Sequence, residues 1–294
     1  MTQKIDYSKI YSPSKLNMFV SCPKSYEFYY LDPIYSQMKN DLKRLPQNIY
    51  SFFTLGKAVH NALTLFFHSL PEQRTKESLK EHLKETWRSE VMKNKKPPLG
   101  QWGGFETLEE ERRTYGEALE MLDNFLKIFE ADFEIEYLPT ADFYHSIKDY
   151  QDLITPLSRD FDISGKFDLV AREGDSLHIV DFKTSKREEE NPFQLRFYKI
   201  LAEEKFKKPV KKASFYFLKT GKKKEFDLEP EKKDKIKEEI LGKIKKITET
   251  ESFEPRPSKL CKFCLYQTFC PLKEAVKKTT REVKEEEFSD DLPF

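Results

Sequence analysis

The chain has 294 residues and a formal net charge of +1, which excludes a globally basic polyanion-binding protein, so any nucleic-acid groove must be local. Its length allows one large domain or two, with 25 Phe and 14 Tyr supplying much of the core. There is no run of 18 apolar residues and no signal-peptide core at the start, so we expect a cytoplasmic protein that does not enter a membrane.

Residues 1–130 are predicted to be mainly helical. Residues 12–31 begin with Ser and Pro at the positions where helices start, carry apolar residues at helical spacing, and break at Cys22-Pro23. Residues 32–50 are expected to form a loop. Residues 52–70 are predicted to form a buried helix with His60 on its second turn, and His60 taken alone could be a packed core histidine. Further helices are predicted at 75–93 and 106–130, with a loop at 94–104 between them.

Residues 131–250 change to the alternating period of strands and are predicted to form an α/β core. Strands are expected at 133–138 and 143–147, followed by a hairpin, a helix at 192–207, strands at 213–218 and 225–228, and a lysine-rich amphipathic helix at 230–248. Residues 251–276, here called the cysteine segment, follow this core. Residues 277–294 lack a periodic apolar face, and we expect them to be disordered.

The hairpin at 161–183 is the stretch around which we expect the chain to be organised. Gly174 supplies the backbone freedom of a tight turn between two β-rich runs. If Arg172 and Leu177 close that turn, Asp168 falls directly opposite Asp181. Two like charges about 5 Å apart on one sheet face are unfavourable unless a cation lies between them. A divalent metal ion is the obvious candidate, and the alternative is a surface hairpin with ordinary solvated charges.

Alternation places Asp181 and Lys183 on the same face of their strand, while Val180 and Phe182 point into the opposite layer. Gln194 and Tyr198, four residues apart on the next helix, lie on one side of it. A hard divalent ion held by two aspartates and a histidine would leave coordination positions for water and a phosphate oxygen. A nearby lysine can position the nucleophile or offset developing charge. The set suits phosphodiester hydrolysis.

The order of these motifs resembles the PD-(D/E)xK nuclease superfamily. The match is best with its RecB-type branch, which includes the RecB and AddB nuclease domains and CRISPR-associated RecB-like exonucleases. The resemblance spans Ser14 to Pro271 and implies a central mixed β-sheet of the restriction-endonuclease-like core flanked by helices, an α/β fold. The motifs are Ser14-x-Leu16, Cys22-Pro23-x2-Tyr26, Gly56-x3-His60, Gly165-x2-Asp168, Val180-Asp181-Phe182-Lys183 and Gln194-x3-Tyr198.

The resemblance also implies residue roles. His60, Asp168 and Asp181 would hold the catalytic Mg²⁺ or Mn²⁺, helped by the Phe182 carbonyl. Lys183 would be the catalytic lysine, and Gln194 with Tyr198 would contact DNA or order the site.

The implied activity is that of a metal-dependent deoxyribonuclease, an exonuclease on single-stranded or end-frayed DNA in repair, recombination or defence. One alternative is a catalytically weak accessory subunit of nuclease fold that binds DNA or a helicase. Another is a cysteine-clamped scaffold whose acidic residues are only surface.

Four cysteines predict a second metal centre. Cys261, Cys264 and Cys270 lie close together and Cys22 lies far upstream, and in a reducing compartment such a group more often ligates metal than forms disulfides. Iron-sulfur members of the RecB-type branch carry this spacing, which implies a [4Fe-4S] cluster. Four thiolates also suit a structural Zn²⁺, the less favoured occupant. Either metal would tie the N-terminal helix to the C-terminal segment.

The last residues resemble the acidic C-terminal tip of bacterial single-stranded DNA-binding proteins. We expect this tail to recruit a helicase or another repair protein, or to fold back over the chain's own DNA groove, and the alternative is a solubilising tail. Unchanged partner binding and nuclease rate after deletion of the terminal Phe would exclude both roles. The residues concerned are Asp290, Asp291, Leu292, Pro293 and Phe294.

Overall fold

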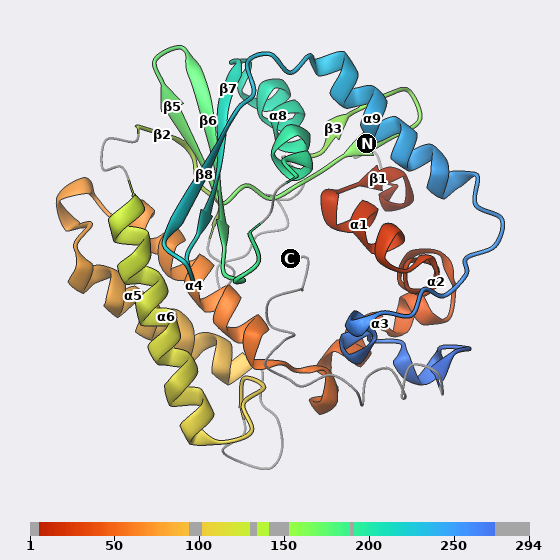
Figure 1. Ribbon diagram of the computed structural model, residues 1–294, viewed down its shortest axis with the longest axis horizontal. Helices are drawn as coiled ribbons and strands as arrows, with labels where there is room; N and C mark the ends of the chain where they lie inside the picture. The colour runs from red at the N-terminus through yellow and green to blue at the C-terminus, as the bar shows by residue number, and fades with distance from the viewer. Residues whose placement is uncertain (1–5, 94–101, 130–133, 141–152, 189–190, 274–294) are drawn as a thin grey trace, which may run out of the picture.

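The computed structural model describes residues 6–93, 102–129, 134–140, 153–188 and 191–273. It is a mixed α/β structure built on a five-stranded sheet of order β2-β5-β6-β7-β8, with helices on both faces (Figure 1). Only the pairing of β6 with β7 is parallel among the ladders of this sheet in the described part of the chain. The strands are β2 (Glu134–Tyr137), β5 (Leu169–Glu173), β6 (Ser176–Lys183), β7 (Val210–Phe217) and β8 (Lys222–Asp227).

The β5-β6 hairpin has the predicted register, since Arg172 faces Leu177 across the turn. Gly174 adopts a φ of 59°, a left-handed conformation that suits glycine in a two-residue hairpin turn. Every residue of β6 is buried, because helices cover both faces of this central strand. Helix α8 (Phe193–Phe206) connects β6 to its parallel neighbour β7, as a parallel pair requires.

The two faces of the sheet pack against different helices, as the predicted alternation requires. On one face the ring of Phe182 lies 6.3 Å from that of Phe67 in α4 and 5.8 Å from that of Phe125 in α6. On the other face Ile179 belongs to the cluster formed by α8 and α9. Neighbouring residues of β6 therefore contact opposite layers. The helices are α4 (Ser51–His68), α5 (Lys76–Lys93), α6 (Leu108–Ile128) and α9 (Lys233–Thr248).

The N-terminal segment forms α1 (Pro13–Ser21), α2 (Pro23–Tyr26) and a π-helical turn at Glu27–Leu31. Ser12 caps α1 by accepting a hydrogen bond from the amide of Lys15, which confirms the predicted start. The expected loop at 32–50 is wrong, because it contains α3 (Tyr35–Arg44). Asp32 Oδ1 accepts hydrogen bonds from the first amides of this turn. Tyr35, Met38 and Leu42 stand at helical spacing and pack with Phe28 and Tyr266, a period that the expected loop overlooked.

A second sheet was not predicted. It joins β1 (Ile10–Tyr11), β4 (Asp162–Ile163) and β3 (Thr155–Pro156), with β1 and β4 parallel. Strands of two residues are too short to show alternation in a sequence. The predicted strand at 143–147, the tail at 277–294 and the loop at 94–104 as far as residue 101 lie outside the described residues.

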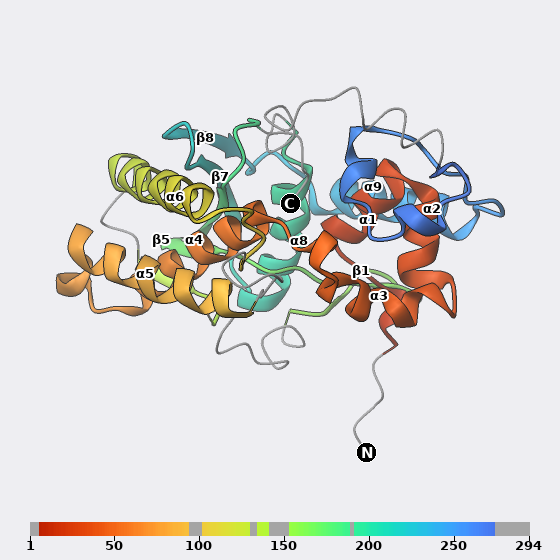
Figure 2. The same cartoon turned by 90° about the horizontal axis from the view of Figure 1, so that it is seen from below.

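The cysteine segment returns to the N-terminal helices (Figures 1 and 2). It contains the 3-10 turns η6 (Lys259–Phe263) and η7 (Gln267–Phe269). Tyr266, 1% exposed, packs its ring 5.4 Å from that of Phe28 and 6.2 Å from that of Tyr35. The two ends of the described chain are therefore held together by an aromatic cluster. Within the described residues, no helix combines the length and apolar character needed to cross a membrane.

Candidate active site

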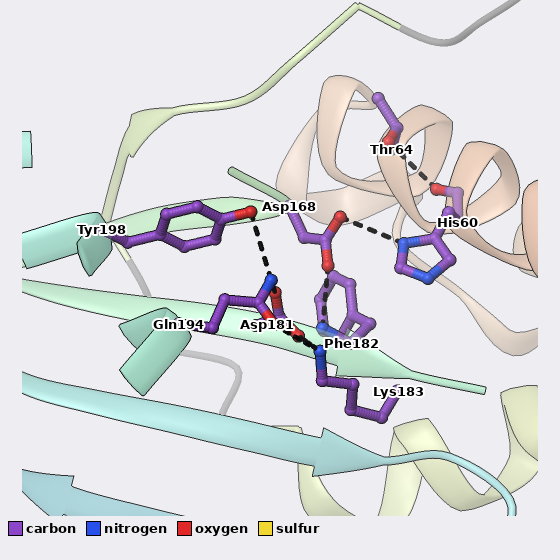
Figure 3. A network of polar contacts seen from close by, with 8 residues as sticks. All are labelled: His60, Thr64, Asp168, Asp181, Phe182, Lys183, Gln194 and Tyr198. Carbon is purple, nitrogen blue, oxygen red and sulfur yellow. Dashed lines mark hydrogen bonds and ion pairs between the residues drawn. The ribbon is translucent and has the colours of Figure 1, made fainter. Parts of the chain in front are cut away.

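His60 and Asp168 meet at the edge where α4 passes the start of the hairpin (Figure 3). His60 Nδ1 lies 3.0 Å from Asp168 Oδ1. The other carboxylate oxygen, Oδ2, accepts a hydrogen bond of 2.9 Å from the amide of Phe182. Asp168 directly precedes β5, so the hairpin register brings it opposite the Asp181 end of β6. The helix-borne imidazole and the first carboxylate are thus in contact, as predicted.

Asp181, Lys183 and Gln194 form a closed triangle of polar contacts (Figure 3). Gln194 Nε2 donates to Asp181 Oδ1 at 2.8 Å, and Lys183 Nζ donates to Gln194 Oε1 at 2.8 Å. Lys183 Nζ also lies 2.8 Å from Asp181 Oδ2 as an ion pair. Gln194 Nε2 additionally donates to the hydroxyl of Tyr198 at 3.2 Å, one turn along α8. One amide side chain therefore orients the acid, the lysine and the phenol.

Electrostatics distinguish the two carboxyl groups. Burial raises the pKa of Asp181, and the nearby Asp168 charge adds to this although Lys183 opposes it. Burial also acts on Asp168, but the His60 charge and hydrogen bond outweigh it and lower its pKa. The pKa of His60 is correspondingly raised by Asp168 despite its own desolvation. Burial next to Asp181 raises the pKa of Tyr198, which stays protonated.

The donor set suits a hard divalent cation. Two carboxylates and an imidazole lie close together here: His60 contacts Asp168, and the buried Asp181 has Lys183 Nζ 2.8 Å from its Oδ2. Lys183 offsets part of the Asp181 charge, and a metal cation would stabilise both carboxylates further, since burial penalises their charged forms. Across the described ranges, no three His, Cys, Asp or Glu side chains are already grouped as a metal site. Binding would therefore require His60 and Asp181 to exchange present contacts for the ion.

Of the two motif glycines near this site, one permits close packing. A Cβ at Gly165 would lie 2.7 Å from Tyr198 Cε1 and 2.8 Å from a methyl carbon of Leu201, so α8 approaches the backbone there. A Cβ at Gly56 would meet Thr184 Oγ1 at 3.4 Å, an ordinary contact. Gly165 is therefore the glycine on which the placement of Tyr198 depends.

The four cysteines line one cavity of about 30 Å³ between α1, α2 and the cysteine segment. Backbone amides point at two of the sulfurs, from Arg256 to Cys22 Sγ at 3.4 Å and from Ser258 to Cys261 Sγ at 3.3 Å. Burial, with added repulsion from neighbouring cysteines, raises the pKa of Cys264 to about 11. The thiolate form of Cys264 would be stabilised by a bound cation, which fits a thiolate-ligated metal. All four are free thiols, without a preformed metal group in the described segments.

Two features complete the comparison between sequence and structure: a groove near the site and the C-terminal tail. The location of a groove beside Tyr50 and Phe263 was not predicted. Its trace in the sequence is the aromatic run Tyr50-Ser51-Phe52-Phe53, which was divided between the expected loop at 32–50 and the helix at 52–70. The tail residues Asp290, Asp291, Leu292, Pro293 and Phe294 lie outside the described residues.

Comparison with known families places this geometry in context. A family model described as the PD-(D/E)XK nuclease superfamily matches residues 10–271, which is most of the chain and includes both the site and the cysteine cavity. No curated protein matches the sequence.

Proposed function

The chain belongs to the PD-(D/E)XK nuclease superfamily, a group of phosphodiester hydrolases that generally use divalent metals such as Mg²⁺, and we propose that it is a RecB-type deoxyribonuclease. Its substrate would be single-stranded or end-frayed DNA, degraded from an end during repair, recombination or defence. The observation that carries the proposal is the meeting of His60 with Asp168 beside the Asp181–Lys183–Gln194 triangle.

His60, Asp168, Asp181 and the Phe182 carbonyl would hold Mg²⁺ or Mn²⁺. When bound, such an ion polarises the phosphorus and lowers the pKa of a coordinated water. Lys183 is 9% exposed, and Gln194 Oε1 and Asp181 hold its ammonium in one orientation. It can therefore contact a phosphate oxygen or the attacking water without losing further side-chain entropy. Tyr198 accepts from Gln194 and, being protonated, keeps its own O–H for a phosphate or a neighbouring acceptor.

The test is degradation of end-labelled single-stranded DNA with Mn²⁺. We expect Asp181→Ala and Lys183→Ala each to lower the rate by roughly 10²- to 10⁴-fold, the range typical of a removed catalytic group. Asp175→Ala, in the exposed hairpin turn, is the matched control and should keep the parent rate. Blocking the 5′ or the 3′ end separately reports polarity. Degradation that persists in both site variants would contradict the assignment.

A second candidate is an accessory subunit that binds DNA or a helicase with little turnover. It is favoured by the contacts that already engage His60 and Lys183, and by the lack of a grouped metal site among the described residues. Strand binding without cleavage at saturating Mn²⁺ would select this candidate. Recruitment of a helicase or repair protein through residues 290–294 stays a proposal from sequence alone.

For the cysteine cavity we propose a [4Fe-4S] cluster on Cys22, Cys261, Cys264 and Cys270, with Zn²⁺ as the less favoured occupant. Support comes from the shared cavity and from the amides directed at two of the sulfurs. Hydrogen bonds from amides to thiolates are typical of such centres. The proposed role is structural, a link between α1, α2 and the end of the chain.

A further inference from the structure

A second concave feature lies beside the candidate active site. It is a groove of about 980 Å³ between the start of α4, one side of α6 and the cysteine segment. None of the eight residues drawn in Figure 3 lines it. The groove therefore needs an explanation of its own.

One wall of the groove is aromatic. The rings of Tyr50 and Phe52 stack with centroids 5.2 Å apart and planes 9° apart. Phe263 meets both edge-on, at 5.0 Å and 5.2 Å. All three rings are half-buried and line the groove, so each keeps surface that faces it. We call Tyr50, Phe52 and Phe263 the aromatic platform.

The platform is shared between two distant parts of the chain. Phe263 lies between Cys261 and Cys264, and Tyr50 donates a hydrogen bond of 3.4 Å to the carbonyl of the adjacent Lys262. One of the three platform rings is thus present only when the cysteine segment docks against α4.

Charges divide the groove into two sides. Lys262 stands beside the platform and Lys186 follows β6, while α6 and the turn before it contribute the acidic side. On that acidic side Lys219 lies 3.5 Å from Glu117 as an ion pair, so their charges offset each other. The platform side carries Lys186 and Lys262 beside the three rings, and the α6 side keeps more acidic than basic residues although Arg113 also lines it. The acidic residues are Glu106, Glu110, Glu117 and Glu120.

The groove lies at the start of the helix that carries His60. Helix α4 runs without a break from Ser51, in the groove, to His60, a rise of about 13 Å at 1.5 Å per residue. Lys186 lines the groove three residues after Lys183. This span corresponds to only a few nucleotides of a stacked strand, at about 3.4 Å each.

We propose that this groove binds one strand of nucleic acid, with bases stacked on the aromatic platform and phosphates beside Lys186 and Lys262, and delivers it to the candidate active site. Stacking on aromatic rings with basic flanks is the general mode of sequence-tolerant single-strand binding. The acidic side of α6 repels a second backbone, so a single strand is preferred over a duplex. The proposal rests on the proposed nuclease function and assigns its strand path.

The test measures binding without turnover. Fluorescein-labelled oligothymidylate is titrated by anisotropy into the Asp181→Ala protein with EDTA present. We expect Phe263→Ala and Tyr50→Ala each to weaken binding about 10-fold, within the range for losing one stacked base. Phe263→Tyr should restore it. Phe269→Ala is the matched control, since that ring lies on the same segment but packs on Tyr35 outside the groove.

Charge-reversal variants provide an independent test if an aromatic variant has a lowered melting temperature. Lys262→Glu should weaken binding and flatten its salt dependence, while Lys259→Glu, exposed on the same turn but outside the groove, should not. If the folded Phe263→Ala, Tyr50→Ala and Lys262→Glu proteins all bind like the parent, the proposed strand binding by the groove is wrong, even if the nuclease is active. Platform-dependent binding by a parent protein that never cleaves would support the groove and reject the proposed function instead.

Discussion

At the scale of single residues, Asp181 is the carboxylate of the site whose charged form is most disfavoured by burial and by a neighbouring charge. Its side chain is buried and lies close to a second carboxylate, and both conditions raise its pKa. Lys183 offsets part of this cost, as the 2.8 Å ion pair shows. A bound metal ion would stabilise the charged form of this buried carboxylate, and this stabilisation contributes to the affinity of the site for the ion.

Metal binding should therefore be visible as stability. We expect Mn²⁺ at about 100 times its dissociation constant to stabilise the parent protein by about 2.7 kcal/mol. Asp181→Asn should lose most of this gain, and Asp175→Asn in the hairpin turn should keep it. Thermal melting with and without Mn²⁺ measures the difference. An equal gain in the Asp181→Asn and parent proteins would place the ion elsewhere.

His178 should give the fold a pH dependence separate from the site. It is 1% exposed, with Nε2 2.8 Å from Ser214 Oγ and Nδ1 3.0 Å from a Glu173 oxygen. Burial lowers the pKa of His178, although Glu173 opposes the shift. The unfolded chain therefore binds this proton more readily than the folded one. The stabilisation is complete above the unfolded pKa of about 6.5 and is lost as pH falls toward the lower, folded value.

Replacing His178 by Gln should accordingly flatten stability between about pH 6.5 and pH 5. Urea unfolding of parent and variant across that range measures the change. The stability difference between the two proteins should favour the parent more at the upper end of the range. A difference that is constant with pH would show that His178 does not titrate in this window.

At the scale of elements, three segments converge on one point. Helix α4 carries His60, the hairpin carries Asp168, Asp181 and Lys183, and α8 carries Gln194 with Tyr198. The approach of α8 depends on the absence of a side chain at Gly165. Packing of one helix against a backbone segment thus controls the position of the side chains that orient the lysine.

Gly165→Ala should disturb this packing. The added methyl would lie within 2.8 Å of both Tyr198 and Leu201, and overpacking of this kind costs about 1–3 kcal/mol. We expect a lower melting temperature and a reduced cleavage rate, because Tyr198 and Gln194 shift together. Gly56→Ala, in α4 with an ordinary 3.4 Å contact, should be neutral or gain up to roughly 1 kcal/mol of helix propensity. Equal effects of both changes would contradict this distinction.

At the scale of the whole molecule, both ends of the described chain meet at the cysteine cavity. Cys22 follows α1, and the other three cysteines lie near the last described residue. A metal on all four thiolates would close a loop of about 240 residues. The entropy of closing such a loop adds on the order of 5 kcal/mol to the free energy of unfolding. A tighter-bound metal adds more.

Protein purified without oxygen should be brown and contain iron. Cys22→Ser should lose the colour and melt at a lower temperature, because the remaining three cysteines no longer tie the ends. Asn17→Ala, exposed on α1, is the control and should change neither property. Absorbance, metal analysis and melting measure the outcome. A colourless, zinc-containing and active parent protein would reject the cluster and keep the structural role.

Local patterns were sufficient to predict the features that depend on chain geometry alone. The hairpin register and the opposite directions of Asp181 and Phe182 follow from alternation, and the cap at Ser12 follows from helix-end chemistry. The order of the motifs was sufficient to predict the superfamily, which the family match confirms. The register, the alternation and the cap depend on neighbouring residues, and the family depends on the order of motifs along the chain. Both kinds of information are present in the sequence.

Features that join distant segments were decided only by the tertiary structure. The β1-β4-β3 sheet pairs strands of two residues, which are too short to show alternation in the sequence. The aromatic platform exists because Phe263 meets Tyr50 and Phe52 across about 210 residues of sequence. Such contacts depend on how separate elements pack, and no local periodicity records that. The residue types of the site and the ordering role of Gln194 could therefore be inferred from the sequence, whereas the groove beside the site could not.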